Sequence, residues 1–144
     1  MNFYGSQSID KILATIIYSI EKHNVHIVVL DTLQFMLSEQ AEGFKKFELQ
    51  DTLMARLRAI SNKYNVHVMI VIHPRKTEDN EDLGIHSIYG TSKASQEADN
   101  IWFIQNRESY KVFDVKKNRY DGELGRVPLG FNRGSKNFFQ LSKE

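Results

Sequence analysis

Cysteine is absent from the 144 residues of this chain. Its absence excludes disulfide bonds and thiolate metal sites, and it fits a reducing compartment. No apolar run approaches the roughly 18 residues that a membrane-spanning helix needs, so no membrane span is predicted. No basic segment followed by a small-residue cleavage site occurs near Met1, so no secretory signal is predicted either.

Excess charge of one sign is also lacking, since the formal net charge is +1. A net charge this small does not by itself indicate a nucleic-acid-binding protein. The charge is unevenly placed, however. Residues 105–144 hold nine Lys and Arg against five Asp and Glu, whereas residues 1–104 hold ten against thirteen. The basic tail is either a surface for an anionic partner or a solvated face without one.

A phosphate-binding loop of the form GxxxxGK[ST] is missing as well. The segment Gly90-Thr91-Ser92-Lys93 has similar residues in the wrong order. These residues therefore do not supply the backbone N–H groups and the lysine that cradle phosphates in such loops. The spacing of the five histidines forms no metal-binding motif.

Two short runs of β-branched residues are the most informative segments that are present. They are VHIVVLD at residues 25–31 and VHVMIVIHPR at residues 66–75. Neither alternates, so each predicts a strand buried on both faces, as in parallel sheets. Amphipathic helices are predicted before them, at residues 9–20 with Ser8 as the N-cap and at about residues 44–64. This order predicts an α/β fold with a mostly parallel sheet flanked by helices, in one domain.

The second half of the chain predicts shorter elements. Residues 74–87 are charged and aperiodic, which predicts a long loop. A short helix at about residues 92–98 precedes a strand at residues 101–105, in which Trp102 is expected to be a core residue. The tail predicts short strands at residues 111–116, 127–131 and 137–141, with turns at Asp121-Gly122 and Arg133-Gly134.

Asp31 and His73 end the two apolar strands and are the first candidate site residues. Side chains at the carboxyl ends of parallel strands face the crevice in which α/β sheets bind ligands. An apolar strand ending in Asp is also the pattern of a Walker B strand, whose carboxylate holds Mg²⁺ on a nucleotide. A His beside it can hydrogen-bond a γ-phosphate. The alternatives are that Asp31 caps the following helix and that His73 is a structural imidazole.

Basic residues form two further candidate sites. Lys117 and Arg119 lie in the turn KNRYDG, from which an arginine can reach a phosphoryl group in trans as an arginine finger. The alternative is a basic hairpin tip in solvent. Arg75, Lys76 and Lys93 border the long loop and can meet nucleic-acid phosphates, although acidic residues in the same loop weaken that interpretation.

Longer segments carry a family resemblance. VIHPRK at residues 71–76, SIYGTSKASQEADNIWFIQNR at 87–107 and KKNRYDGELGRVPLGFN at 116–132 resemble the Twinkle-like mitochondrial replicative helicases. They are more distantly similar to phage primase–helicases and bacterial DnaB. DTLQFM at residues 31–36 resembles the Walker B segment of this family, and FYGSQSID at residues 3–10 resembles the stretch just upstream of it.

The resemblance implies a RecA-like P-loop NTPase core, of which residues 1–144 are the C-terminal part of the helicase domain without its Walker A portion. It implies a hexameric ring and 5′-to-3′ movement on single-stranded DNA during replication, with Mg²⁺ and ATP or another NTP as cofactors. It also implies the mitochondrial matrix or nucleoid, with another organelle or a phage-infected cytoplasm as the alternative.

The resemblance also implies roles for single residues. Asp31 matches the Walker B aspartate and Mg²⁺ ligand, and His73 matches the phosphate-sensing residue. Arg119 matches the arginine finger, with Lys117 as its companion. Arg107 and Phe131 match positions that sandwich the nucleotide base. The loop from Arg75 to about Ser87, with Lys76 in it and Lys93 beyond it, corresponds to a DNA-binding loop of the central channel.

In this family the P-loop and the water-activating glutamate would lie before Met1, so the chain alone is expected to be inactive. Two alternatives belong to other functional classes. One is a catalytically dead RecA-like interaction or regulatory module that docks onto a ring. The other is a recombinase-type RecA relative, against which the VIHPRK and KNRYDG segments argue.

Overall fold

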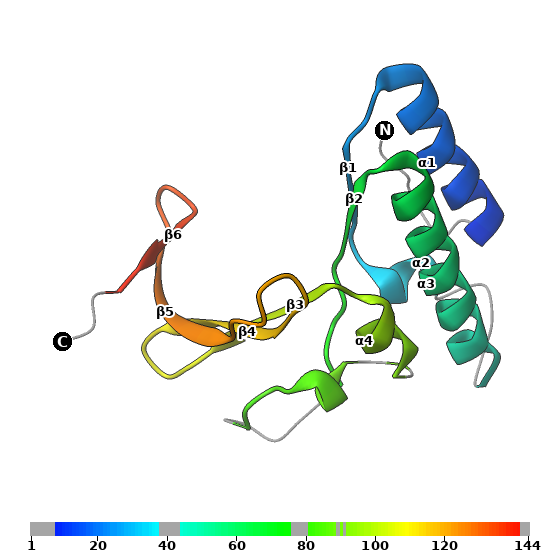
Figure 1. The fold of residues 1–144 in the computed structure, drawn as a ribbon. Coiled ribbons are helices and arrows are strands. Elements are labelled where there is room, and N and C mark those ends of the chain that lie inside the picture. The colour runs from blue at the N-terminus through cyan, green and yellow to red at the C-terminus, as the bar shows by residue number, and fades with distance from the viewer. Residues whose placement is uncertain (1–7, 38–43, 76–80, 89, 91, 142–144) are drawn as a thin grey trace. The chain divides into compact units, whose positions relative to one another are not determined.

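A computed structural model describes residues 8–37, 44–75, 81–88, 90 and 92–141 of the chain (Figure 1). These residues fall into two compact units. The first unit lies within residues 1–75 and 88–97, and the second lies within residues 76–87 and 98–144.

The first unit contains most of the helices. Its elements are α1 (Ile9–His23), β1 (Ile27–Leu30), α2 (Leu33–Leu37), α3 (Phe44–Tyr64), β2 (His67–Ile70) and α4 (Lys93–Glu97). The predicted helices and strands before residue 75 are confirmed, and α2 is an additional short helix. The second unit contains the 3₁₀ turn η1 (Ile85–Ser87) and the strands β3 (Asn100–Asn106), β4 (Lys111–Asn118), β5 (Gly125–Asn132) and β6 (Asn137–Gln140).

Helix α1 begins and ends at residues with capping geometry. The Ser8 side chain accepts a hydrogen bond from the Lys11 backbone N–H at 3.3 Å, so the predicted N-cap is confirmed. At the other end, Asn24 takes a left-handed conformation with φ of 53°, and its N–H donates to the Ile20 carbonyl oxygen. The chain then turns directly into β1.

The core of the first unit lies between its helices and one face of its strand pair. Leu13 of α1, Leu33 of α2 and Leu53 of α3 are almost completely buried there. β1 and β2 are parallel, with Ile27 opposite His67 and Leu30 opposite Ile70. Helices α1 and α3 lie side by side along this pair (Figure 1).

The other face of the strand pair is less covered than predicted. Ile27 and Val29 of β1 are 63% and 57% exposed, and Met69 of β2 is 38% exposed. The unbroken apolar pattern predicts burial on both faces, but the described helices of this unit pack on one face only. Within the described residues, these strands therefore have one buried and one open face.

The second unit is an antiparallel meander in the order β3-β4-β5-β6. The connections between its strands span four to six residues, and connections this short join antiparallel neighbours, since parallel strands need long crossovers. The α/β class predicted from the sequence is confirmed. The prediction of a mostly parallel sheet is wrong for the described strands, because only β1 and β2 pair in parallel and β3 to β6 pair antiparallel.

Trp102 is predicted to be a core residue, but it lies on the exposed face of β3. Strand β3 alternates, so that Ile101, Phe103 and Gln105 are buried on one face while Trp102 and Ile104 point to the other. Trp102 is 47% exposed and packs against Phe113, with ring centroids 5.8 Å apart.

None of the helices in the described part of the chain has the length and apolar character of a membrane-spanning helix.

Candidate functional site: the carboxyl edge of the parallel strands and the basic turn

The carboxyl ends of β1 and β2 bring Asp31 and His73 to one edge of the first unit. The Val71 N–H donates to the Leu30 carbonyl oxygen at 2.9 Å, and the Leu33 N–H donates to the Val71 carbonyl oxygen at 3.0 Å. These bonds extend the strand register past the last paired residues. Asp31 and His73 are both exposed at this edge, so the predicted juxtaposition of the two strand ends is present.

A residue that the sequence analysis did not select, Gln34 of α2, connects the two strand ends. Its side-chain amide donates to the His73 carbonyl oxygen at 2.7 Å and accepts from the His73 N–H at 3.1 Å. This paired contact holds the His73 backbone to the helix that follows Asp31. A single Gln has no distinctive sequence pattern, so the contact could be found only from the structure.

The Asp31 carboxylate fits the role of a Mg²⁺ ligand on a bound nucleotide. Mg²⁺ in such sites keeps several waters and takes only one or two carboxylates, with phosphate oxygens completing its shell. In the described part of the chain, no hydrogen bond or ion pair engages this exposed carboxylate. No group of three or more His, Asp or Glu residues that could hold a metal ion occurs among the same residues. Asp31 therefore suits a metal ion that is held jointly with phosphate oxygens.

Of the three predicted DNA-binding cations, two lie in the described part of the first unit. The Arg75 guanidinium donates to the Gly90 carbonyl oxygen at 2.5 Å, close to the bridge that pairs Pro74 with Ile88. Lys93 begins α4 and forms an ion pair with Glu97 at 3.8 Å. Lys76 lies outside the described residues. The structure thus joins the segment that carries Arg75 to the segment that leads to Lys93.

Gly90 explains how closely this segment approaches α3. Its φ of +114° suits glycine only, and a Cβ there would lie 2.1 Å from the side-chain nitrogen of Gln50. Gln50 is itself 1% exposed. The backbone before Lys93 is therefore packed directly against a buried polar side chain of α3.

The turn KNRYDG is ordered by its own polar side chains. The Asn118 amide donates to Asp121 and to the Glu123 carbonyl oxygen, and its oxygen accepts from the Tyr120 N–H at 3.2 Å. The Asp121 carboxylate also accepts from the Glu123 N–H at 2.8 Å. Gly122 has φ of 77°. The predicted turn is therefore a defined structure that presents Arg119 from the end of β4.

Arg119 is bound by Asp99 through both backbone and side chain. Its N–H donates to the Asp99 carbonyl oxygen at 3.0 Å, and its guanidinium donates to the Asp99 carboxylate at 2.9 Å. The Arg119 side chain is still 52% exposed. Lys117, at a half-buried position of β4, lies two residues before it. Asp99 is a partner that the sequence analysis missed, because it precedes β3 and is 20 residues away.

Arg107 and Phe131, the predicted base-binding residues, both belong to the second unit. Arg107 follows β3, and its guanidinium is paired with Asp82. Phe131 of β5 is 38% exposed and packs against Phe138 of β6, with centroids 4.9 Å apart. The predicted site residues are thus divided between the two units, with Asp31 and His73 in the first and Arg119 in the second.

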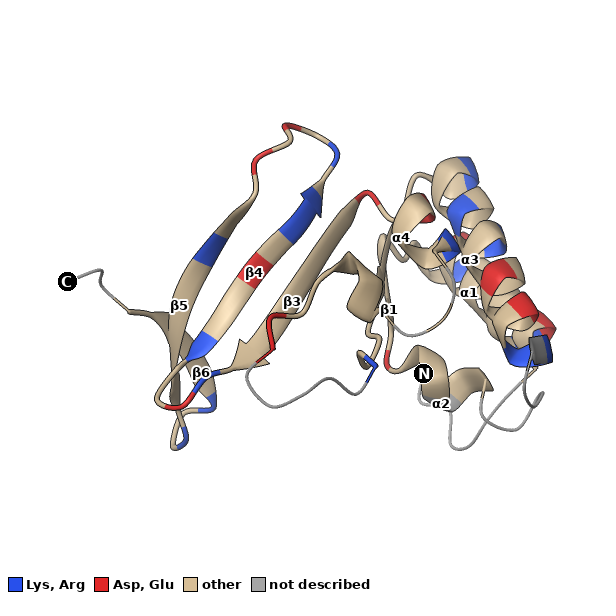
Figure 2. Cartoon of the chain, turned by 90° about the horizontal axis from the view of Figure 1, so that it is seen from below, with Lys and Arg blue, Asp and Glu red and all other residues tan. Residues whose placement is uncertain are grey.

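The basic tail does not form a surface of one sign. Figure 2 shows Lys and Arg on β4 and β5 and in the turns beside them, with Asp and Glu interspersed. Asp114 on β4, for example, forms ion pairs with Lys116 and Arg126. The excess of positive charge in residues 105–144 is thus partly neutralised within the unit itself.

These elements define an α/β protein with a RecA-like fold. A family model described as an AAA domain matches residues 2–79, more than half of the chain. The chain therefore belongs to this AAA-domain family. The match includes α1, β1, α3, β2 and both Asp31 and His73.

Two solved structures share the fold. One is described as an ATPase domain; it is 20% identical with a TM-score of 0.75, covering 95% of this chain and 52% of that one. The other is the KaiC-like protein PH0186 from Pyrococcus horikoshii OT3, which is 12% identical with a TM-score of 0.66, covering 94% of this chain and 57% of that one. The chain thus spans about half the length of each.

Proposed function

We propose that this chain supplies one part of the nucleotide site of a ring-forming DNA helicase that moves 5′-to-3′ on single-stranded DNA. The observation that carries the proposal is the placement of Asp31 at the carboxyl end of β1, beside the end of β2, where Gln34 holds the His73 backbone. Membership of the AAA-domain family and the likeness to a solved ATPase domain support it.

Each strand end has its own part in this proposal. The exposed Asp31 carboxylate orients the metal ion of a Mg²⁺–ATP complex, or of another NTP. Mg²⁺ bound with the nucleotide neutralises charge on the β- and γ-phosphate oxygens. In this proposal His73 donates a hydrogen bond to the γ-phosphate, and this bond is lost when the phosphate leaves. The His73 backbone is bound to Gln34 of α2, so loss of the bond can be transmitted to that helix. Phosphate loss is thereby sensed next to the metal-binding residue.

Arg119 acts in trans in this proposal, on the nucleotide of a neighbouring subunit. The ordered KNRYDG turn and the half-exposed side chain support this role, and Asp99 holds the guanidinium until the neighbour is present. Arg107 and Phe131 bind the base, the arginine by its planar guanidinium and the phenylalanine by stacking. Transition-state charge on the phosphoryl group is what an arginine finger stabilises.

Single-stranded DNA is the proposed polymer substrate, bound by the loop of residues 75–87 and by Lys93. Arg75 is exposed at the base of this loop, and its bond to Gly90 fixes the loop's starting point. Six copies in a hexameric ring would surround one strand. The mitochondrial matrix or nucleoid is the proposed location, on the strength of the resemblance to Twinkle-like helicases.

The test uses two proteins: the 144-residue chain, and a joined protein in which it follows the P-loop-bearing half of a DnaB-like ATPase domain. We expect no NTP hydrolysis above background from the chain alone, because it has no phosphate-cradling loop. The joined protein should hydrolyse NTP, and Asp31→Asn should lower its kcat by at least about 10²-fold, since metal-bound phosphate charge is then poorly stabilised.

Asp10→Asn is the matched control, because Asp10 is an 83% exposed acid of the same unit whose ion pair with Arg56 lies on the surface. Robust turnover by the 144-residue chain alone would contradict the proposal. A joined protein in which Asp31→Asn and Asp10→Asn behave alike would contradict the role of Asp31.

A second candidate is a catalytically dead module that docks onto a ring. The half-exposed Arg119 side chain supports it, since a docking module could lend this arginine to a neighbouring nucleotide site. In that case the joined protein would show no turnover, while the 144-residue chain would change the rate of an intact DnaB-like ring to which it is added.

A further inference from the structure

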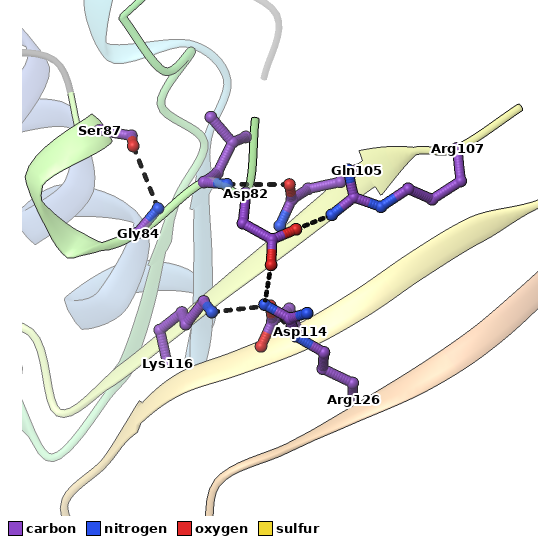
Figure 3. Close-up of polar contacts among 9 residues, drawn as sticks. Asp82, Gly84, Ser87, Gln105, Arg107, Asp114, Lys116 and Arg126 are labelled. Carbon is purple, nitrogen blue, oxygen red and sulfur yellow. Dashed lines mark hydrogen bonds and ion pairs between the residues drawn. The ribbon is translucent and has the colours of Figure 1, made fainter. Parts of the chain in front are cut away.

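The Asp82 carboxylate is shared between two arginines, Arg107 directly after β3 and Arg126 of β5. One carboxylate oxygen accepts a hydrogen bond from the Arg107 guanidinium. The other accepts one from the Arg126 guanidinium at 2.7 Å (Figure 3). Asp82 itself belongs to the segment of residues 81–87 that precedes β3. We call this arrangement of Asp82, Arg107 and Arg126 the Asp82 latch. It ties a loop segment to β5 and to the end of β3 in one sheet.

A buried carboxylate supports the latch from β4. Asp114 is 2% exposed, and its carboxylate accepts from Arg126 Nε at 2.8 Å and from Lys116 Nζ at 2.9 Å. A buried charge is tolerated only when it is paired in this way. Arg126 therefore binds Asp114 through Nε and Asp82 through a terminal nitrogen, so that its contact with Asp114 orients the guanidinium toward Asp82.

The backbone of the same segment is held by polar contacts as well. The Leu83 N–H donates to Gln105 Oε1 at 3.0 Å, and Gln105 is 5% exposed. The Gly84 N–H donates to Ser87 Oγ at 3.0 Å, and the Ser87 N–H donates to the Gly84 carbonyl oxygen at 2.8 Å. Apolar burial adds little here, since Ile85 is 40% exposed. Ionic and hydrogen-bonding contacts are therefore the main attachment of this segment.

Gln105 is only partly satisfied by hydrogen bonds in the orientation that binds this segment. Its Nε2 is buried without a hydrogen-bond partner among the described residues. The bond from the Leu83 N–H requires Oε1 at its observed place, so exchanging the two amide atoms would break it. A buried donor without a partner costs free energy. The orientation of Gln105 that leaves Nε2 unpaired is the one that binds the Leu83 N–H, next to Asp82.

We propose that Asp82 is a positioning residue that fixes residues 81–87 and the Arg107 guanidinium relative to each other. The role of Arg107 in base binding and the role of the loop in DNA binding rest on the proposed function. In that setting, the latch connects the end of the DNA loop directly to a base-binding side chain. Release of Asp82 removes one attachment of the loop segment and one carboxylate contact of the Arg107 guanidinium.

Hydrogen exchange of the 144-residue chain tests the latch itself, without reference to nucleotide. Asp82→Asn should speed exchange of the Leu83, Gly84 and Ser87 amides by about fivefold, as expected for loss of two partly exposed ion pairs of modest strength. Amides of α3 should be unchanged. In the parent chain, about 1 M salt should produce the same change, because it screens exposed charges.

Glu108→Gln is the matched control, because it removes a carboxylate from an exposed residue next to Arg107 that is outside the latch. Equal exchange in the parent and Asp82→Asn chains would overturn the latch. So would an equal acceleration by Glu108→Gln, since the effect would then reflect net charge alone.

The positioning role is tested by equilibrium binding of ATP to the joined protein. Asp82→Asn should weaken binding by about threefold to tenfold, whereas Glu108→Gln should leave it unchanged. Faster exchange without weaker ATP binding would overturn the positioning role and leave the latch a structural contact. Failure of the parent joined protein to bind ATP at all would instead overturn the proposed function, and the exchange result would still decide whether the latch exists.

Discussion

The side chain of Arg119 leaves an ordered turn but remains attached to Asp99. An arginine finger acts on charge that develops in the transition state, so its removal should lower kcat and leave nucleotide binding largely intact. We therefore expect Arg119→Ala in the joined protein to cost at least about 10³-fold in kcat, with ATP binding within about threefold of the parent. Steady-state kinetics together with equilibrium ATP binding provides the measurement.

Arg133→Ala is the control for that variant, because Arg133 is an exposed arginine of another turn, between β5 and β6. Loss of an arginine finger should lower kcat far more than about threefold. If the kcat of Arg119→Ala stays within about threefold of the parent, Arg119 is only a solvated turn residue.

Leu53 is the residue on which the core of the first unit depends most clearly, since it is 0% exposed on α3. Leu53→Ala should lower the free energy of unfolding by about 2–5 kcal/mol, because it removes buried apolar surface and leaves a cavity. Leu124→Ala, at a 63% exposed leucine, should change it by no more than about 0.5 kcal/mol. Chemical denaturation of both variants gives the comparison, and equal effects would contradict the assigned core.

At the scale of elements, local patterns predicted most of the structure. The apolar stripe after Ser8 predicts α1 and its cap, and the stripe from Phe44 to Tyr64 predicts α3, because both signals lie within a few helical turns. The turns at Asp121-Gly122 and Arg133-Gly134 predict the strand breaks of the tail, because glycine and Asp favour turn conformations.

What the sequence did not predict depends on contacts between distant residues. Gln34 with His73, Asp99 with Arg119 and Asp82 with Arg126 are separated by 39, 20 and 44 residues. A single side chain gives no periodic signal, so none of these pairs could be found from spacing. The open face of β1 was missed for a related reason, because apolar composition indicates that a face can be buried but not what covers it.

In the proposed function, DNA binding depends on the loop of residues 75–87, which follows β2. Arg75→Ala combined with Lys76→Ala should weaken binding of single-stranded DNA by the assembled joined protein to a similar extent for all sequences, because phosphate contacts carry no base information. Each lost contact should lower the logarithmic salt slope by roughly 0.7. Fluorescence anisotropy at several salt concentrations measures both quantities, with Arg133→Ala as the control.

At the scale of the whole molecule, the chain has a net charge of only +1, and each copy offers few phosphate contacts. Binding to single-stranded DNA should therefore depend on assembly, since a ring multiplies the contacts and raises their effective concentration. The 144-residue chain, verified as a monomer by sedimentation, should show no detectable binding at about 0.15 M salt. Tight binding by that monomer would contradict this and would assign the DNA site to the basic tail.

In the proposed function, residues of two neighbouring subunits complete one nucleotide site, with Asp31 from one subunit and Arg119 from the other. The most direct test mixes two inactive forms of the joined protein, Asp31→Asn and Arg119→Ala, and measures NTP hydrolysis. Random assembly places an intact Asp31 beside an intact Arg119 at roughly a quarter of the interfaces of a closed ring, so activity should return to a comparable fraction of the parent rate. No recovery, in mixed rings whose formation is verified, would contradict the claim.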